Sequence, residues 1–137
     1  MFIRSALSAA AISSVVALSA CGGDDEKSSE PEAEAKASPQ QAITEIAAVR
    51  TALGEAVDQL KAGDKAAADE TVSEAYLQHF EKVEGPLEER DHELNEELEE
   101  SISHELRDKI KTGSETEVEA LVVEIEGDLT TAEAKLK

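Results

Sequence analysis

Residues 114–136 read SETEVEALVVEIEGDLTTAEAKL, and the spacing of their apolar side chains decides the fold. These side chains recur every three or four positions, which is the period of a helix with one buried face. They are Val118, Leu121, Val122, Ile125, Leu129, Ala132 and Leu136. Ser114 and Glu117 can each satisfy a backbone N–H group of the other, in the pattern of a capping box. The stretch therefore predicts a long amphipathic helix that begins at Ser114.

Three segments earlier in the chain show the same helical spacing of apolar residues. The first is predicted to begin at Ser38-Pro39 and to end at Gly63, and the second to begin near Asp64. Gly85-Pro86 predicts the end of the second helix, because proline cannot continue a helix. The third is predicted from about Leu87 to residues 112–113. The expected core residues of these segments are Ile43, Ile46, Ala47, Leu53, Val57 and Leu60; Ala68, Val72, Ala75, Tyr76, Phe80 and Val83; and Leu87, Leu94, Leu98, Ile102, Leu106 and Ile110.

Four amphipathic helices joined by short links predict an all-α fold, an antiparallel up-down four-helix bundle over residues 39–137. No segment alternates apolar and polar residues convincingly, so we expect no sheet. Gly54 and Gly127 lie inside predicted helices, where each costs about 1 kcal/mol relative to alanine. One interpretation is that they let neighbouring helices approach closely.

A segment of different composition precedes the bundle. Residues 22–39 read GGDDEKSSEPEAEAKASP and contain no large apolar side chain. Such a segment buries too little surface to offset its ordering entropy. We therefore expect residues 21–38 to be a disordered acidic tether. It is interpreted as a spacer, although a terminus that contributes only solubility would have the same composition.

The first twenty residues have the pattern of an export signal. Arg4 gives the N-terminal end of the segment a positive charge, and residues 6–18 form an apolar run too short to span a membrane. Leu18-Ser19-Ala20-Cys21 resembles the lipobox of bacterial lipoproteins, with the single cysteine of the chain at the modified position. The resemblance implies a signal peptide at 1–20, acylation of Cys21, and a lipid anchor in the cell envelope facing the periplasm or the outside. A plain secretory signal is the alternative.

The charge balance excludes several function classes. The chain contains 32 Asp and Glu residues but only 13 Lys and Arg residues, a net charge of −19. This surface repels nucleic-acid phosphates and favours cations or basic proteins as partners. The chain shows no Ser-His-Asp arrangement, no phosphate-binding glycine loop and no free thiol once Cys21 is acylated. We therefore expect a protein that is not an enzyme.

Histidines and carboxylates are concentrated in the middle of the chain. His79, His92 and His104 lie there, and eight of the thirteen residues from 88 to 100 are acidic. Imidazole and carboxylate groups together suit iron, manganese or zinc, whereas a solvated helix face would have the same composition. A turn at 85–86 would bring His79 and Glu81 or Glu84 close to Asp91 and His92. In the alternative interpretation, His79 only hydrogen-bonds to Asp91 or a glutamate as a satisfied core pair.

These residues belong to a longer resemblance. Tyr76, His79-Phe80-Glu81 and Glu84-Gly85-Pro86-Leu87, followed by Asp91, Leu94 and Leu98-Glu99, resemble the extracytoplasmic N-terminal helical domain of bacterial high-affinity iron permeases. The similarity covers about forty residues, 69–110. It implies a helical module associated with iron uptake, with an iron permease or another envelope protein as partner. The positions that carry over are Tyr76, Phe80, Glu81, Glu84 and Asp91.

Two functional hypotheses follow. In the first, the chain is a lipid-anchored accessory module that handles iron or another divalent or trivalent metal. Its predicted ligands are His79, Glu81, Glu84, Asp91 and His92, with Tyr76 and Phe80 beside them. In the second, the chain is a non-catalytic acidic interaction module of the cell envelope without a specific metal.

Overall fold

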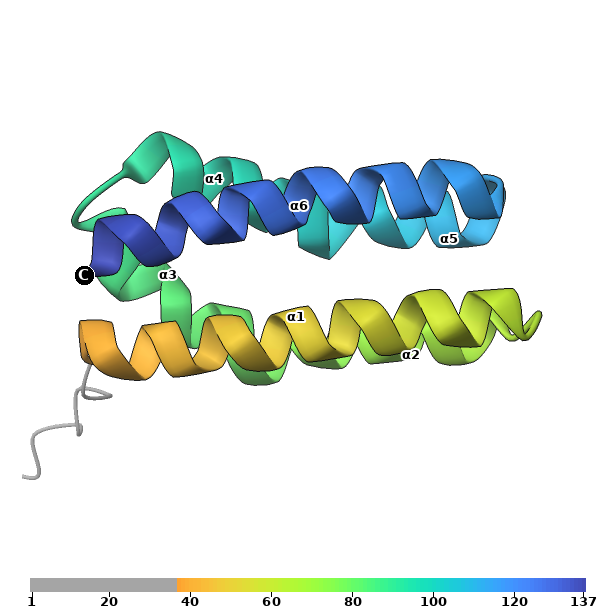
Figure 1. Cartoon of the computed structure of the whole chain (residues 1–137), viewed down its shortest axis with the longest axis horizontal. Helices are drawn as coiled ribbons and strands as arrows, with labels where there is room; N and C mark the ends of the chain where they lie inside the picture. The colour runs from red at the N-terminus through yellow and green to blue at the C-terminus, as the bar shows by residue number, and fades with distance from the viewer. Residues whose placement is uncertain (1–36) are drawn as a thin grey trace, which may run out of the picture. The chain divides into compact units, whose positions relative to one another are not determined.

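The computed structural model describes residues 37–137, and this part is built from helices. The segments in chain order are α1 Pro39–Lys61, α2 Lys65–Ala75, the π-helical turn η1 Tyr76–Phe80, α3 Glu81–Glu88, α4 His92–Glu100, the π-helical turn η2 Ser101–Glu105, α5 Leu106–Thr112 and α6 Glu115–Leu136. The segments α2, η1 and α3 are continuous and form the second rod, and α4, η2 and α5 form the third. Together with α1 and α6 they make four rods (Figure 1). Residues 37–137 contain no strand. The predicted all-α class is confirmed.

The four rods pack as an up-down bundle. Helix α1 packs against both α2 and α6, while α2 contacts α5 and α6 contacts α4 and α5. Successive rods run in opposite directions, with the α1–α2 and α5–α6 turns at one end of the bundle (Figure 1). Short links give this arrangement because each rod can bury its apolar stripe only against its neighbours.

Local capping residues set the predicted helix starts. The Ser114 hydroxyl accepts a hydrogen bond from the Glu117 amide at 3.4 Å, and the Glu117 carboxylate accepts one from the Ser114 amide at 2.8 Å. Ser38 and Gln41 form the same reciprocal pair at the start of α1. Both arrangements satisfy backbone donors that the first helical turn leaves unpaired. The predicted starts at Ser38 and Ser114 are confirmed.

The turn between α1 and α2 also follows the sequence. Gly63 has a φ of 84°, in the left-handed region that side chains with a Cβ atom rarely adopt. Asp64 then caps α2, since its side chain accepts a hydrogen bond from the Ala67 amide at 3.0 Å. Glycine followed by a capping aspartate therefore ends one helix and begins the next.

The prediction that Gly85-Pro86 ends the second helix is wrong. Pro86 lies inside α3, which continues to Glu88, and the turn occupies residues 89–91. Gly85 has no Cβ atom to clash with the proline ring, and only the last turn of the helix follows Pro86. Pro86 and Leu87 are both buried, so packing offsets the hydrogen bond that proline removes. The third rod begins at His92 instead of Leu87.

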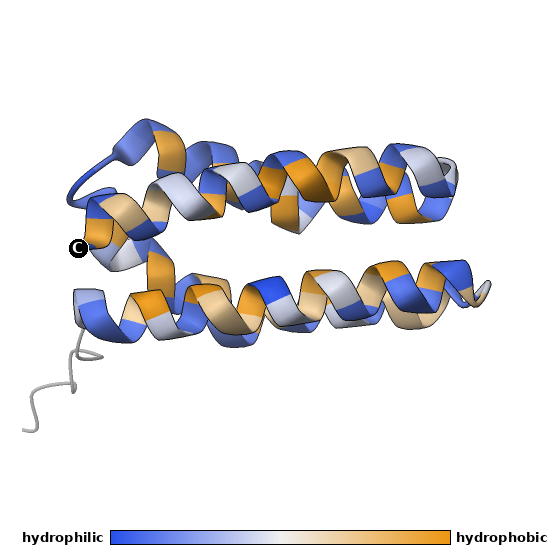
Figure 2. Ribbon diagram, viewed as in Figure 1, coloured by the Kyte–Doolittle hydropathy of each residue, from blue (hydrophilic) through white to orange (hydrophobic). Residues whose placement is uncertain are grey.

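The core is a single cluster drawn from all four rods (Figure 2). Phe80 is its largest fully buried side chain. Every predicted core residue of the third rod is buried, and in α6 only Val122 remains partly exposed. All members of the cluster lie between residues 42 and 136. The part of the chain from Glu32 to Lys137 forms a compact unit of its own, so we expect residues 37–137, which hold this core, to fold as a unit.

Two predicted core residues of α1, Ala47 and Val57, do not belong to the core. Ala47 is exposed, whereas the neighbouring positions Ile46 and Val49 are fully buried. A single step along a helix turns the side chain by about 100°, which moves Ala47 out of the buried stripe. That stripe consists of Ala42, Ile46, Val49, Leu53, Ala56 and Leu60.

The interpretation of Gly54 and Gly127 as close-contact glycines is also wrong. A Cβ atom at either position would meet no heavy atom within 4 Å. At Gly113, by contrast, a Cβ atom would lie 2.8 Å from the Lys109 carbonyl oxygen. The close approach that excludes a side chain is therefore at Gly113, in the turn before α6, and not at Gly54 or Gly127.

Several predictions concern residues outside the described part of the chain. They are the signal peptide at 1–20, the acylated Cys21, and the tether up to residue 36. Among the described helices, none combines the length and the apolar composition that a membrane span requires.

Candidate functional site

Tyr76 and three glutamates form the most distinctive polar group on the second and third rods. The Tyr76 hydroxyl donates a hydrogen bond of 2.9 Å to Oε1 of Glu84. The Tyr76 ring stacks on Phe80, with ring centroids 6.0 Å apart and planes inclined by 29°. Glu81 and Glu99 lie close enough for their charges to act on both Tyr76 and Glu84. We call Tyr76, Glu81, Glu84 and Glu99 the Tyr76 cluster.

The electrostatics of the cluster favour neutralisation of Glu84. Burial raises the pKa of the Glu84 carboxyl group, and the charges of Glu99 and Glu81 raise it further. The hydrogen bond from Tyr76 acts in the opposite direction. Burial, followed by the contact with Glu84, also raises the pKa of the Tyr76 hydroxyl group. Tyr76 therefore stays protonated as the donor, and Glu84 bears a charge at an energetic cost.

No cationic side chain of residues 37–137 compensates this cost. Among the described residues, no Lys, Arg or His forms an ion pair with Glu81, Glu84 or Glu99. Most other half-buried carboxylates of the bundle do have such a partner. Asp69, for example, pairs with Arg107 at 2.8 Å. The Tyr76 cluster is thus a local excess of negative charge.

Two irregular turns flank the cluster. Tyr76 is the first residue of η1, and Glu81 and Glu84 follow it on α3. Glu99 lies two residues before η2 on the neighbouring rod. Single π-helical turns within α-helices are less regular than the helix around them and occur frequently at functional sites. The side-chain group and both backbone irregularities therefore fall in one region of the bundle.

His79 was predicted to lie close to Asp91 and His92, but in the structure its partner is a different residue. Its Nδ1 atom lies 2.6 Å from Oε2 of Glu45 on α1, and Lys82 Nζ lies 3.3 Å from the other oxygen of that carboxylate. The hydrogen bond from His79 lowers the pKa of Glu45 against the effect of burial, and Lys82 lowers it further. His79 and Lys82 thus hold a carboxylate of the first helix, a partner that the sequence pattern did not identify.

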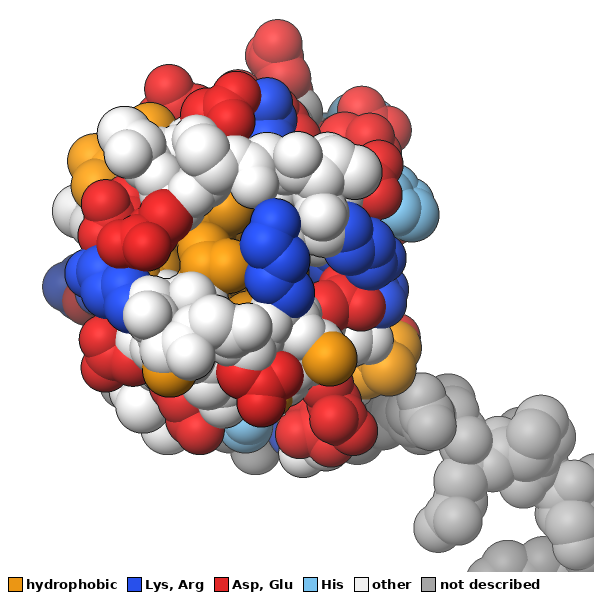
Figure 3. Space-filling view, turned by 90° about the vertical axis from the view of Figure 1, so that its right-hand side faces the viewer, with side chains coloured by type: hydrophobic (Ala, Val, Ile, Leu, Met, Phe, Trp, Pro, Cys, Tyr) orange, Lys and Arg blue, Asp and Glu red, His pale blue; other side chains and the backbone are white. Residues whose placement is uncertain are grey.

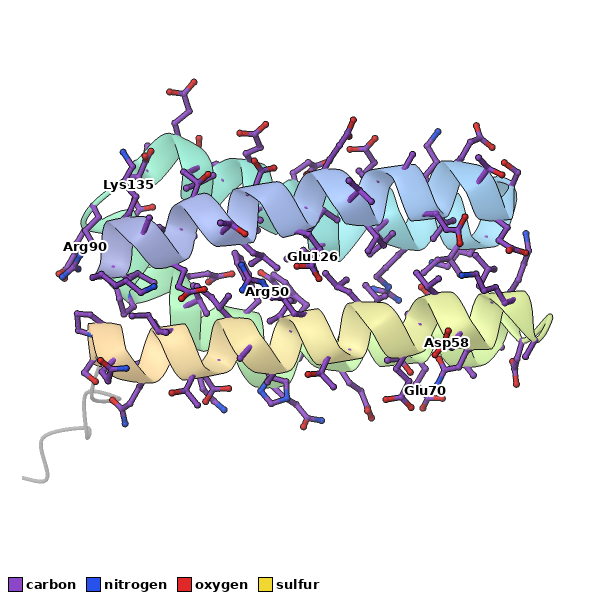
Figure 4. All side chains as sticks on the ribbon, viewed as in Figure 1. Arg50, Asp58, Glu70, Arg90, Glu126 and Lys135 are labelled. Atoms are coloured by element: carbon purple, nitrogen blue, oxygen red, sulfur yellow. The ribbon has the colours of Figure 1, made fainter. Side chains whose placement is uncertain are left out.

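Asp91 begins a helix. Its Oδ1 atom accepts a hydrogen bond from the Leu94 amide at 3.2 Å, and its Oδ2 atom lies 3.0 Å from Lys135 Nζ. Lys135 projects from α6 near the turn between the second and third rods (Figure 4). The Lys135 ammonium group, with the Leu94 amide, lowers the pKa of Asp91. Both oxygens are therefore engaged within the bundle.

His92 is exposed at the start of α4. Its Nδ1 atom lies 2.7 Å from Glu88 and its Nε2 atom 3.4 Å from Glu96. These two carboxylates raise the pKa of His92, Glu88 most strongly. The charged imidazolium form, which cannot bind a metal, is thereby favoured. Residues four apart on a helix lie side by side, which is why Glu96 also reaches His92.

The predicted ligands are thus distributed over several places. Two predicted ligands, Glu81 and Glu84, lie in the Tyr76 cluster, and Phe80 supports the cluster from the core. The other three predicted ligands each have other partners: His79, Asp91 and His92. No three His, Asp or Glu side chains among residues 37–137 are arranged to hold a metal ion without rearrangement. Sequence reasoning did not assign Glu99 to the site, although Glu99 is part of the motif that resembles the iron permeases.

Acidic side chains dominate the surface elsewhere as well. Figure 3 looks at the end of the bundle with the two short turns, where Asp and Glu side chains surround most of the rim. Comparisons with known proteins give no further guide, since no protein-family model, curated protein or solved structure matches this chain.

Proposed function

We propose that this chain is a metal-handling module of the bacterial cell envelope, anchored by a lipid on Cys21 and associated with iron uptake. The observation that supports metal handling is the Tyr76 cluster, in which three carboxylates around one tyrosine have no cationic partner in the described part of the chain. A bound cation would relieve the repulsion that raises the pKa of Glu84. The chain is not proposed to be an enzyme.

The donor atoms of the cluster indicate a class of metal. Carboxylate and phenol oxygens favour hard cations such as iron(III), manganese and calcium over softer metals that prefer nitrogen or sulfur. Glu81 and Glu99 are exposed, so their side chains can turn toward a cation beside Glu84. Binding therefore involves rearrangement of these two side chains, while Tyr76 and Glu84 hold their positions.

Anchoring and partnership are supported by sequence features alone. The lipobox-like segment ending at Cys21 would tether the bundle to a membrane. The motif around Tyr76 and Glu84 resembles the extracytoplasmic domain of iron permeases. Together they favour a module that presents metal to a permease or another envelope protein.

Metal titration of residues 37–137 tests the proposal. Tyr76 is the only tyrosine of the chain and tryptophan is absent, so tyrosine fluorescence reports on the cluster directly. We expect one equivalent of iron(III) to quench this fluorescence and calorimetry to give the same stoichiometry. Manganese, zinc, calcium and magnesium are titrated in parallel.

Two variants with the same change of charge localise the metal. Glu84→Gln should weaken binding by about tenfold or more, a loss of about 1.4 kcal/mol. Glu124→Gln removes an exposed carboxylate on α6 and should leave the affinity within about twofold. Weak binding shared equally by calcium and magnesium, and equally reduced by both variants, would contradict the proposal and leave only charge screening.

The second candidate is a non-catalytic acidic interaction module without a specific metal. The net charge of −19 favours it, because such a surface attracts basic proteins. This hypothesis predicts binding to a basic partner that is weakened by salt, with no stoichiometric metal. An apolar groove on another face of the bundle, with two carboxylates in its lining, gives it a specific location, as follows.

A further inference from the structure

A shallow apolar groove runs along the seam between α1 and α6, on a different side of the bundle from the Tyr76 cluster. Its volume is about 560 Å³, within the range of about 300–1,000 Å³ typical of binding pockets. The residues that line it are Gly54, Val57 and Asp58 from α1, and Glu119, Val122 and Val123 from α6.

The floor of the groove is open and apolar. Val123 is 71% exposed and is one of two large hydrophobic residues on the surface of the described part, the other being Leu77. Gly54 lacks a side chain, and no heavy atom lies within 4 Å of the place that its Cβ atom would occupy. The groove therefore has room for the side chains of another molecule, against valine surface that is now in water.

Ion pairs between α1 and α6 bound the groove at both ends. Arg50 lies 3.1 Å from Glu126, and the two side chains point toward each other across the seam (Figure 4). Lys61 lies 2.7 Å from Glu119 at the other end. Residues 50 and 61 are eleven positions apart, so the groove is about 16 Å long at 1.5 Å per residue. This length accommodates about three turns of a helix.

The charges of the lining select the occupant. Its two charged residues are both carboxylates, Asp58 on the α1 side and Glu119 on the α6 side. Asp58 has no ion-pair partner among the described residues, while Lys61 forms its ion pair with Glu119 and acts on Asp58 only through its charge at longer range. A second copy of this acidic chain would bring further carboxylates to the same place. A helix with an apolar stripe flanked by Lys or Arg would place opposite charges there.

We propose that the α1–α6 groove docks a basic amphipathic helix of a partner protein. Apolar side chains of that helix, spaced three and four residues apart, occupy the space over Gly54 and pack on Val57, Val122 and Val123. Its basic side chains contact Asp58 and Glu119. This surface is separate from the Tyr76 cluster, so docking and metal binding can be tested independently.

Two synthetic peptides of about 18 residues test the proposal, one with Leu and Lys and one with Leu and Glu at the same positions. Binding to residues 37–137 is measured by fluorescence anisotropy at two salt concentrations. We expect the Lys peptide to bind with a stoichiometry of one to one and the Glu peptide not to bind. Circular dichroism melts establish that each protein used is folded.

A pair of variants separates docking in the groove from attraction by charge alone. Val123→Glu should reduce the affinity by about tenfold or more, although it adds a negative charge. Leu77→Glu adds the same charge at the other exposed hydrophobic residue, on η1, and should not weaken binding. Both positions are exposed, so both variants should fold.

Two results would overturn the proposal. Equal or tighter binding of the Lys peptide to Val123→Glu would mean that charge alone attracts it. Self-association of residues 37–137 that Val123→Glu abolishes, without binding of either peptide, would identify a second copy as the occupant. Metal titration of Val123→Glu should match the original protein, so failure of this proposal does not affect the metal-handling proposal.

Discussion

The Tyr76 hydroxyl group donates a hydrogen bond of 2.9 Å to Glu84, which joins the first residue of the π-helical turn η1 to helix α3. The bond holds a half-buried carboxylate beside Glu81 and Glu99, whose charges oppose its ionisation. Because Tyr76 also stacks on the buried Phe80, the donor has a fixed position. Glu84 is thereby held at the surface as an acceptor whose negative charge is balanced by no cation from the described helices.

Replacement of Tyr76 by phenylalanine should raise the pKa of Glu84. The hydrogen bond from Tyr76 favours the ionised carboxylate, so its loss leaves burial and the neighbouring charges unopposed. The measurement is a carbon-13 NMR titration of the Glu84 carboxyl group in both proteins. An unchanged pKa would mean that the hydrogen bond has no influence on ionisation. Glu124, on the exposed face of α6, provides an internal reference.

Replacement of Glu84 by glutamine should stabilise the metal-free protein at pH 7. The pKa of Glu84 is higher in the folded than in the unfolded state, so the protonated form stabilises folding at acid pH. This contribution is lost as the pH rises through the folded pKa. Glutamine resembles the protonated form at every pH and can still accept the hydrogen bond from Tyr76.

Denaturant unfolding of both proteins between pH 3 and pH 8 checks this prediction. The stability difference should be largest near neutral pH and should vanish below the usual carboxyl pKa of 4.5. A difference that does not depend on pH would show that a change in packing, and not the charge of Glu84, is responsible.

Replacement of Asp69 by asparagine should have the opposite pH dependence. Hydrogen bonds from Arg107, against the effect of burial, lower the pKa of Asp69, and Lys111 lowers it further. The stability that the carboxylate contributes is therefore present above its unfolded pKa of 3.8 and is lost as the pH falls through the folded value. Because the pair is partly solvated, we expect a loss of about 0.2–1 kcal/mol at pH 7.

Chemical unfolding of Asp69→Asn at pH 7 and pH 2 tests this expectation. The stability difference between the two proteins should shrink as the pH falls from 7 to 2, because protonation of Asp69 removes the contribution of its charge. Glu124→Asn serves as a control, since Glu124 makes no ion pair among the described residues.

Substitution of glycine by alanine should have opposite effects at two positions. Gly127→Ala places a methyl group in open space on an exposed helix and should stabilise the protein by about 0.5–1 kcal/mol. Gly113→Ala would place its Cβ atom 2.8 Å from the Lys109 carbonyl oxygen, so the α5–α6 turn must shift and stability should fall. Thermal melts of the two variants measure both effects, and loss of stability in Gly127→Ala would indicate a contact on that face.

The sequence alone determined where the helices lie along the chain and which apolar side chains form their buried faces. Apolar spacing and capping groups such as Ser38, Ser114 and Gly63 act within one or two helical turns, so local sequence is sufficient to define them. Ala47, which lies outside the buried stripe, was one exception, and Pro86 was another. Its burial, which depends on the other rods, let the helix continue past a residue that normally ends it.

Only the tertiary structure decided which polar side chains meet. Glu45 with His79, Asp69 with Arg107 and Asp91 with Lys135 are contacts between different rods. Such pairs depend on the rotation and axial register of packed helices, which no local pattern specifies. Moving the turn from 85–86 to 89–91 changes the register by about 6 Å, enough to change the residues that face each other. The sequence therefore identified Tyr76 and Glu84 as candidates, whereas packing of the third rod added Glu99. Packing of α1 and α6 gave His79 and Asp91 other partners.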